Sequence, residues 1–405
     1  MIKPEILAPA GNLDKLKTAI DFGADAVYLG GTKLNLRAFA DNFTNEQLKE
    51  GVEYAHERGK KVYVTLNIFP HNEDLDGAGE YILQLQAMNV DAILVSDPGI
   101  FAIAKEVAPK LEVHLSTQAN NVNWRSAKFW HDLGVKRIVL ARELSLKEIK
   151  EIRDNLPEEC ELEAFVHGAM CVSYSGRCLL SNYMVGRDSN RGACAQPCRF
   201  NYYLVEEKRP GEYYKINEDE KGTYIMNSKD LCMIEHIDKV IEAGVYSLKI
   251  EGRMKSNFYV AAVVKAYRQA VDAYFESPKD YKFEKEWMDN LNKVSHRIYS
   301  TGFYFGDEER QIYDSSAYTR TADIVGMVKE FDEENMVATI EQRNKVFDNE
   351  TVQVLRPEGD LFDVVLTDMT ENDGQKIESA PRPQMLFKVK VNVPLRVKDI
   401  IIKNI

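Results

Sequence analysis

Eight short runs of apolar and β-branched residues recur through the first part of the chain, and amphipathic segments such as Asn45–Arg58 and Leu146–Asn155 separate most of them. Strands that alternate with helices predict a parallel sheet, and eight such units favour closure into a (β/α)8 barrel of the TIM type. An open doubly wound sheet is the alternative. The eight runs are Glu5–Ala8, Ala26–Leu29, Lys61–Asn67, Ala92–Val95, Glu112–Ser116, Arg137–Leu140, Glu161–Phe165 and Ser247–Ile250.

One connection is far longer than the others, because about 80 residues separate Phe165 from Ser247. Segments that follow the C-terminal ends of barrel strands form the functional face of such folds. We therefore expect a barrel over residues 1–300 that carries a functional insertion at about 168–240.

The pattern changes near Thr321. Helices are expected at Asn257–Phe275 and Glu284–Ile298, whereas alternating runs separated by Gly, Asn and Asp turns fill residues 321–405. The alternation predicts a second domain, a small antiparallel β-barrel. Its runs are DIVGMVKEF, MVATIEQ, ETVQVL, LFDVVL and LFKVKV.

Four of the six cysteines lie within the insertion, at Cys171, Cys178, Cys194 and Cys198. Clustered thiolates suit zinc or an iron–sulfur cluster, although buried free cysteines are also common core residues. The spacing lacks the two tight C-x2-C pairs of structural zinc sites, which favours a cluster. Cys232 is a spare ligand candidate, and Cys160 is expected to pack in the core.

The charge around these cysteines differs from that of the whole chain. The chain carries a formal charge of −12, which disfavours indiscriminate coating of nucleic acid. Between Gly168 and Phe200, however, four arginines face one acidic residue, Asp188. With Lys249, Arg253 and Lys255 after the eighth strand, they form either a cationic mouth for an anionic substrate or a simple offset to thiolate charge.

Polar residues at or just after strand ends are the default catalytic candidates of a barrel. We single out His114, Glu163, His167 and Glu251, with Arg142, Arg177, Lys249 and Arg253 as candidate substrate-binding cations. Each residue alone is also explained as a satisfied core group or a helix cap. Gly11, Gly30 and Gly31 are expected to make tight turns after strands. No G-x-S-x-G, H-E-x-x-H or Walker motif is present.

Long motifs of the chain resemble those of the collagenase-like peptidase family, family U32. They include EAFVHGAMC from Glu163, SGRCLLS from Ser175, GACAQPCR from Gly192 and LKIEGRMKS from Leu248, and shorter matches are LAPAGN, HLSTQ, LARE and MNSKDL. The resemblance covers roughly residues 4–300, and the tail is similar to the C-terminal β-domain of that family.

The resemblance implies a function that the family name does not suggest. The branch most similar to this chain hydroxylates tRNA without oxygen, forms 5-hydroxyuridine at the wobble position and requires prephenate. In this branch a 4Fe–4S cluster is expected on Cys171, Cys178, Cys194 and Cys198. Other members act on an rRNA cytidine. A base must leave its stack to reach a barrel mouth.

Two other functions compete with this one. A peptidase needs an activated nucleophile, a metal-bound water or paired carboxylates, and no such motif is present. A non-catalytic RNA-binding or cluster-carrying subunit is the third hypothesis. We expect a cytoplasmic protein with no membrane partner, because no apolar run is long enough to span a bilayer and no signal peptide is recognisable. The sequence is compatible with a homo-oligomer or with a hetero-oligomer formed with a related family member.

Overall fold

The computed structural model describes residues 2–35, 42–171, 173–174, 177–199, 203–204, 214–215, 227–306, 311–312 and 318–405. Most of residues 200–226 of the expected insertion lie outside these ranges, as do the first residues of the motifs at Ser175 and Met226.

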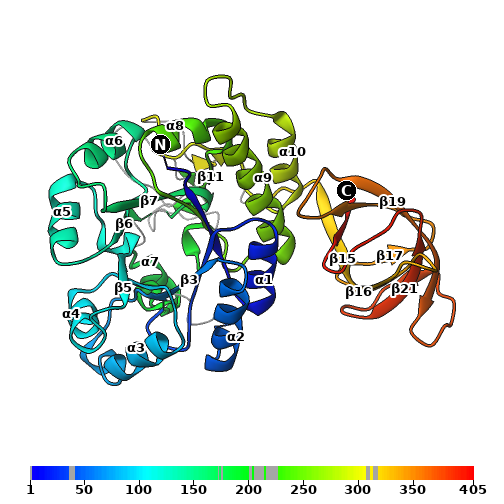
Figure 1. The fold of residues 1–405 in the computed structure, drawn as a ribbon, viewed down its shortest axis with the longest axis horizontal. Coiled ribbons are helices and arrows are strands. Elements are labelled where there is room, and N and C mark those ends of the chain that lie inside the picture. Colours follow the sequence, from blue (N-terminus) through cyan, green and yellow to red (C-terminus); the bar gives the residue numbers. More distant parts are fainter. Residues whose placement is uncertain are drawn as a thin grey trace.

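Eight parallel strands close into a barrel, and helices surround it (Figure 1). Closure is made by the pairing of the last strand with both the first and the seventh, for example Ser247 with Glu5 and with Glu163. This confirms the predicted (β/α)8 architecture and excludes the open sheet. The strands are β1 (Glu5–Pro9), β2 (Ala26–Leu29), β3 (Lys61–Leu66), β4 (Ala92–Val95), β5 (Glu112–Leu115), β6 (Arg137–Val139), β7 (Glu161–Ala169) and β12 (Ser247–Ile250).

The outer helices begin at residues suited to the role. Thr44 and Ser145 form capping boxes with Gln47 and Glu148, and Asp97 caps a helix whose first residue is proline. These caps fix the residue at which each helix begins after the preceding strand. The helices are α1 (Leu13–Asp21), α2 (Asn45–His56), α3 (Ala78–Ala87), α4 (Pro98–Val107), α5 (Trp124–Asp132), α6 (Leu146–Asp154), α8 (Ile237–Glu242), α9 (Asn257–Glu276) and α10 (Lys285–Lys293).

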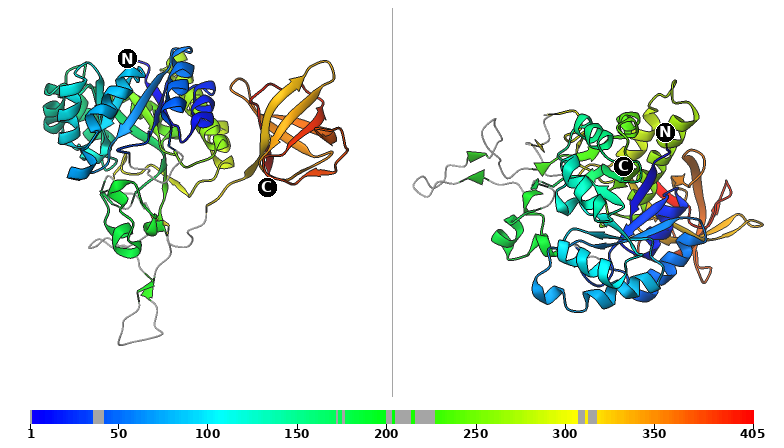
Figure 2. Two further views of the ribbon diagram at one scale, coloured as in Figure 1. Left: turned by 90° about the horizontal axis from the view of Figure 1, so that it is seen from below. Right: turned by 60° about the vertical axis from the view of Figure 1, so that its left-hand side comes forward.

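Strand β7 extends beyond the barrel. Its last residues pair antiparallel with β11 (Asp230–Cys232), which in turn pairs with β13 (Tyr299–Ser300). The insertion therefore leaves and re-enters the sheet at neighbouring positions. Its helix α7 (Leu180–Val185) lies beyond one end of the barrel, below the ring of helices in the left view of Figure 2.

The second domain is a closed antiparallel barrel, as predicted. A last strand that the sequence pattern did not single out, β22, pairs with both β15 and β18 and completes the closure. The strand order is β15-β16-β21-β19-β18-β22, with a short β17–β20 pair beside it. The strands are β15 (Ala322–Asp332), β16 (Val337–Gln342), β17 (Val346–Phe347), β18 (Thr351–Leu355), β19 (Phe362–Glu371), β20 (Ser379–Ala380), β21 (Leu386–Val391) and β22 (Ile400–Asn404).

The two barrels share part of one hydrophobic core. Ala322, Leu355 and Ile400 of the second domain are buried in the same cluster as the TIM-type barrel. From α9, the buried Lys265 donates to the carbonyl oxygens of Arg356 at 2.8 Å and Gly359 at 2.6 Å. The β-domain is thus packed against α9 rather than tethered by a linker alone (Figure 1).

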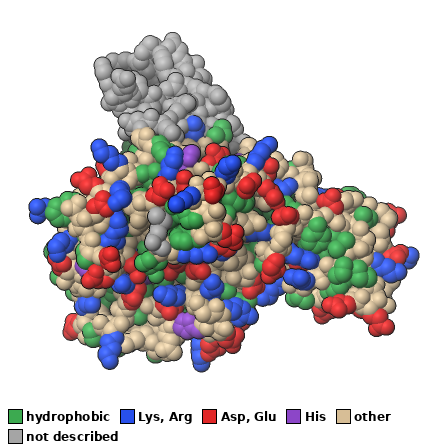
Figure 3. Space-filling view, turned by 45° about the horizontal axis from the view of Figure 1, so that its top comes forward, with side chains coloured by type: hydrophobic (Ala, Val, Ile, Leu, Met, Phe, Trp, Pro, Cys, Tyr) green, Lys and Arg blue, Asp and Glu red, His purple; other side chains and the backbone are tan. Residues whose placement is uncertain are grey.

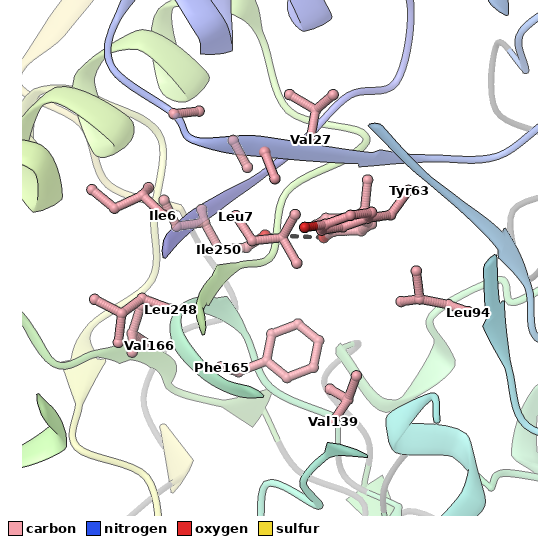
Figure 4. Packing of buried hydrophobic residues seen from close by; sticks show 14 of the residues in the cluster. Ile6, Leu7, Val27, Tyr63, Leu94, Val139, Phe165, Val166, Leu248 and Ile250 are labelled. Carbon is pink, nitrogen blue, oxygen red and sulfur yellow. Dashed lines mark hydrogen bonds between the residues drawn. The ribbon is translucent and has the colours of Figure 1, made fainter. Parts of the chain in front are cut away.

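Apolar side chains of the strands fill much of the first barrel (Figure 4). Leu7 and Phe165 share strand faces with Glu5 and Glu163 and point into the barrel, where they are 0% and 5% exposed. Val27 and Leu248 point to the opposite face and are fully buried between the strands and the helices. Burial of this kind stabilises the fold by about 1.5–3 kcal/mol for each large side chain.

The barrel interior also contains buried charges. The guanidinium of Arg137, 1% exposed, lies 2.7 Å from Glu5, 2.8 Å from Glu161 and 3.2 Å from Glu163. The Tyr63 hydroxyl donates to Glu5 at 2.7 Å. Removing one member of a buried charge network leaves the others unpaired and destabilises the fold. Substitution at any of these positions is therefore expected to be costly.

Candidate functional site

A small polar cavity of about 90 Å³ opens at the C-terminal end of the barrel strands. In TIM-type barrels this face carries the active site. We call it the mouth cavity. Its lining residues are Tyr28, Thr65, Asn67, Leu94, Ser116, Thr117, Gln118, Arg142, Phe165, Lys249, Glu251 and Arg253.

Lys249, from the middle of β12, lies in the floor of the mouth cavity. Its Nζ lies 2.5 Å from Oε1 of Glu163 and over the ring of Tyr28, 4.6 Å from its centroid. Burial lowers the pKa of Lys249, and Glu163 opposes that effect. Burial alone would raise the pKa of Glu163, yet Lys249 and Arg137 hold it below its ordinary value. Glu163 is therefore an ionised partner beneath the cavity rather than part of its lining.

Arg142 lies over the ring of Phe165. Its guanidinium carbon is 3.9 Å from the ring centroid, and its Nη1 donates to the carbonyl oxygen of Ala169 at 2.9 Å. Cation–π stacking and a backbone hydrogen bond together hold the planar group in one orientation. The charge is therefore positioned at the mouth before any ligand binds.

Arg253 occupies space that two glycines leave open. A Cβ on Gly30 would lie 2.3 Å from Nη2 of Arg253, and one on Gly11 would lie 2.2 Å from its carbonyl oxygen. Neither glycine has a positive φ. These two glycines are needed for close approach rather than for a left-handed backbone, because they leave room for a buried arginine. Arg253 is 5% exposed and donates to Asn42 at 3.2 Å.

Two acceptor oxygens in the mouth lack partners. Asn67 Oδ1 and Gln118 Oε1 are buried and accept no hydrogen bond within the part of the chain that the structure describes. The other atom of the Asn67 amide donates to Ser116 at 3.1 Å. Buried polar atoms without partners are costly, so these oxygens fit a ligand that brings donors.

Glu251 supplies a carboxylate beside the cations. The Tyr28 hydroxyl lies 3.1 Å from its Oε2 and 3.0 Å from the carbonyl oxygen of Ile250. Gly168, with φ of 109°, allows β7 to approach closely, since a Cβ there would lie 2.4 Å from the Glu251 carbonyl oxygen. The carboxylate is thus fixed at the edge of the mouth.

A second cavity of about 160 Å³ adjoins the mouth cavity and is lined by all four clustered cysteines. It shares Gln118, Arg142 and Glu251 with the mouth cavity, so the two are neighbours. We call it the cysteine cavity. Its lining residues are Gln118, Arg142, Ala169, Met170, Cys171, Cys178, Ser189, Cys194, Gln196, Pro197, Cys198, Glu251, Gly252, Met254 and Lys255.

Two of these sulfurs accept backbone hydrogen bonds. The N–H groups of Leu180 and Gln196 point at the sulfurs of Cys178 and Cys194, each at 3.3 Å. Hydrogen bonds to sulfur stabilise thiolates and tune iron–sulfur clusters. Among the described residues no three His, Cys, Asp or Glu side chains are close enough to hold a single metal ion. In a 4Fe–4S cluster each thiolate binds a different iron, so its ligands lie further apart than those of one zinc ion.

The cysteines outside the cavity differ from the four that line it. Cys232 and Cys160 are buried, and burial raises the pKa of Cys232 to about 12 and that of Cys160 to about 11. Neither residue lines the cysteine cavity, whereas Cys198 does. Geometry therefore favours Cys198 over Cys232 as the fourth member of the set.

His114 and His167 lie away from both cavities. His114 is fully buried inside the barrel, with Nε2 2.8 Å from Glu112, and burial holds its pKa well below the ordinary value. His167 packs against Tyr259, Tyr267 and Tyr299, and burial lowers its pKa to about 3. No histidine is present among the described residues that line either cavity.

Arg177 contacts a residue of the mouth through that residue's backbone. Its Nη2 donates to the carbonyl oxygen of Gln118 at 3.2 Å, and its guanidinium stacks on Phe69 at 5.0 Å. Among the residues that were not singled out from the sequence are Tyr28, in the lining of the mouth cavity, and Arg137, in the charged network beneath it. Tyr28 lies two residues from Ala26 on β2 and so shares its face, and Arg137 is a charge at the start of an otherwise apolar strand. Both signals were present in the sequence.

Fold and site together define a TIM-type barrel protein with a cysteine-lined cavity at its mouth and a C-terminal β-barrel. The chain belongs to peptidase family U32: that family's model matches residues 11–314, and the model of the family's C-terminal domain matches residues 320–401.

Three curated relatives illustrate the range of names in the family. A tRNA hydroxylation protein P1 of Bacillus subtilis is 45% identical over 96% of this chain and 92% of its own. A tRNA hydroxylation protein P of Escherichia coli is 37% identical over 94% of this chain and 92% of its own. A protein named collagenase from Porphyromonas gingivalis is 38% identical over 75% of this chain and 73% of its own. In the described parts of the chain, no helix has the length and apolar character needed to span a membrane.

Proposed function

We propose that this protein is an oxygen-independent tRNA hydroxylase that forms 5-hydroxyuridine at the wobble position. The observation that carries the proposal is the shared wall of the two cavities: Gln118, Arg142 and Glu251 line both the cationic mouth and the cysteine cavity. Relatives named for tRNA hydroxylation match this chain over nearly its whole length, which supports tRNA as the substrate class.

Cys171, Cys178, Cys194 and Cys198 are the residues that would hold a 4Fe–4S cluster. Their common cavity and the N–H groups directed at two of the sulfurs support this assignment. When bound, such a cluster supplies an iron centre for electron transfer or for polarising a bound oxygen. The protein's own part is to keep that centre beside the mouth and to cover it with Met170 and Pro197, which also line the cavity.

Prephenate is the cosubstrate that we assign to the mouth cavity. It carries two carboxylates and a hydroxyl, which match cations and orphan acceptors respectively. Arg142, Lys249 and Arg253 supply the cations, and one of the two orphan acceptors, Asn67 Oδ1 or Gln118 Oε1, can accept from the single hydroxyl. The ion pair of Lys249 with Glu163 keeps the ammonium in the floor while the ligand exchanges.

The uridine must reach these groups as a single flipped base. A base drawn out of its stack can lie against the flat Arg142–Phe165 pair and bring its N–H to an unpaired acceptor. Glu251, fixed by Tyr28, is the carboxylate placed to accept or return a proton at the edge of the mouth.

Deletion of the gene tests the proposal. Total tRNA from cells grown without oxygen should lose 5-hydroxyuridine and its derivatives, measured by mass spectrometry of nucleosides, and a plasmid copy should restore them. Growth without oxygen removes any contribution from oxygen-dependent enzymes. Persistence of the modification, with no related gene able to supply it, would overturn the assignment; a cytidine of large-subunit rRNA would then be the next base to measure.

The collagenase-like relative makes peptide hydrolysis the second candidate function. A cysteine peptidase pairs its thiol with a histidine. No histidine lines the two cavities in the described parts of the chain, and the four cysteines face one cavity together. We therefore expect purified protein not to cleave gelatin. Turnover that survives further purification and is lost in a point variant would favour the peptidase.

A further inference from the structure

Large apolar side chains stand in solvent around the cysteine cavity. Tyr183 is 89% exposed, Leu179 75%, Met254 61% and Tyr174 52%. A cluster of exposed apolar side chains often marks a site where a protein binds a partner or a ligand. We call these four residues the rim patch.

The rim patch adjoins the cavity through its own chain neighbours. Met254 is a lining residue of the cysteine cavity, and Leu179 follows Cys178, another lining residue. Leu179 and Tyr183 are one helical turn apart, so they share a face of the short helix α7. Ser181, on the other face, is fully buried and accepts from the N–H of Ala195 at 2.9 Å. The helix is therefore held against the Cys194 segment with Leu179 and Tyr183 turned to solvent.

Tyr174 is held at the mouth by a different contact. Its carbonyl oxygen accepts from Asn120 at 3.4 Å and from the N–H of Arg177 at 3.1 Å. Arg177 in turn bonds the backbone of Gln118, which lines both cavities. The patch and the entrance to the site are thus parts of one surface.

The charge of this segment decides between kinds of partner. Residues 168–200 hold four arginines and one acidic residue in a chain whose formal charge is −12. On the face seen in Figure 3, positive and negative side chains alternate without a broad basic field. A local positive segment with exposed tyrosines suits a short stretch of single-stranded RNA, whose phosphates meet arginines and whose bases stack on aromatic rings.

A protein partner on the same patch would cover the entrance through which a macromolecular substrate delivers its base. We propose that the rim patch binds the single-stranded RNA that flanks the target base, with Tyr183 as the principal stacking residue. The inference rests on the proposed function, because it takes RNA as the substrate.

The test compares four variants of the anaerobically purified holoprotein. The probe is a synthetic, unmodified anticodon stem–loop RNA, and binding is measured by fluorescence anisotropy. Tyr183→Ala should raise Kd roughly 5- to 100-fold, the loss expected for one base–aromatic stack. Tyr183→Phe keeps the ring and should bind like wild type, and Leu179→Ala should weaken binding less than Tyr183→Ala.

The matched control is Phe129→Ala, because Phe129 is an aromatic residue 58% exposed on α5, in the outer helical ring. It should leave Kd unchanged. The inference is overturned if Tyr183→Ala binds the RNA as tightly as wild type, or if Phe129→Ala loses as much RNA affinity as Tyr183→Ala. It is also overturned if Tyr183→Ala changes only the oligomeric mass measured by light scattering. If wild type and Tyr183→Ala hydroxylate tRNA equally well, the proposed role of the rim patch is wrong and the proposed function stands. Wild-type protein that neither binds nor modifies RNA defeats the proposed function as well.

Discussion

The ammonium of Lys249 and the carboxylate of Glu163 form a buried pair, 2.5 Å apart, between the floor of the mouth cavity and the charged barrel interior. Arg137 contacts the other oxygen of the same carboxylate at 3.2 Å. One carboxylate thus serves two cations, which links the substrate face of the barrel to the network beneath it.

Glu163→Gln should destabilise the protein more than loss of an exposed pair. It leaves Lys249 and Arg137 buried with less compensation, which typically costs about 3–5 kcal/mol. Urea unfolding monitored by circular dichroism measures the change. The double variant Glu163→Gln/Lys249→Met should recover part of the loss. A single variant as stable as wild type would contradict the pairing.

Each of the four cavity cysteines should be needed for iron binding, and Cys232 should not. Anaerobically purified wild type should be brown and contain about four irons per chain if the cluster is of the 4Fe–4S type. Alanine at Cys171, Cys178, Cys194 or Cys198 should abolish stoichiometric iron. Cys232→Ala is the matched control because that thiol is buried in β11. Colourless wild type holding stoichiometric zinc after anaerobic reconstitution would count against the cluster.

Arg253→Ala should lower hydroxylation without unfolding the protein. Loss of a charged hydrogen bond from a dry site weakens an anion complex by a few kcal/mol, so the decrease should be on the order of 100-fold. The measurement is 5-hydroxyuridine per tRNA at several prephenate concentrations, with unfolding curves alongside. Arg58→Ala, at an exposed site just after the C-terminal end of α2, is the control. Equal modification in both variants would put the anion site elsewhere.

The buried histidines should make the protein less stable as the solution becomes acidic. Burial lowers the pKa of His167 to about 3, so the unfolded chain takes up a proton near pH 6.5 while the folded chain does not. As the pH is lowered between these two values, proton uptake by the unfolded chain at His167 should reduce the free energy of unfolding by about 1.4 kcal/mol per pH unit. Above about pH 7 this residue should have no effect on the pH dependence of stability.

His167→Asn should remove one such contribution and flatten the slope of unfolding free energy between about pH 6.5 and 4.5. The exposed His71→Gln is the control. Anaerobic urea titrations at several pH values provide the data, and identical slopes for wild type and His167→Asn would refute the effect.

Strand order and direction were readable from the sequence, but the depth of a residue within the barrel was not. Glu163 and His114 were singled out as polar candidates at strand ends. Both lie below the mouth rather than in it, because height along the axis depends on how neighbouring strands are staggered. Lys249, Arg253, Arg142 and the cysteines, by contrast, do line the cavities. Arg142, Arg253 and the cysteines follow strands in the sequence, where chain position and height coincide, whereas Lys249 lies within β12.

The ends of strands and helices were mispredicted where pairing with residues distant in sequence determines them. The strand predicted to end at Phe165 continues to Ala169 because β11 pairs with its extension. The helix expected through Ile298 stops at Lys293, since His296 instead bridges to Thr319. Neither partner is visible to a local pattern.

The pairing of His167 with Cys232, and of Ala169 with Asp230, has a consequence for how this family can diversify. The two ends of the intervening segment are hydrogen-bonded side by side, so the barrel can accommodate a segment of any length between them. Doubling such a loop adds only about 0.6 kcal/mol of closure entropy. Selection can therefore lengthen, shorten or exchange this segment, and so address new substrates, while the scaffold and its charged interior are inherited intact.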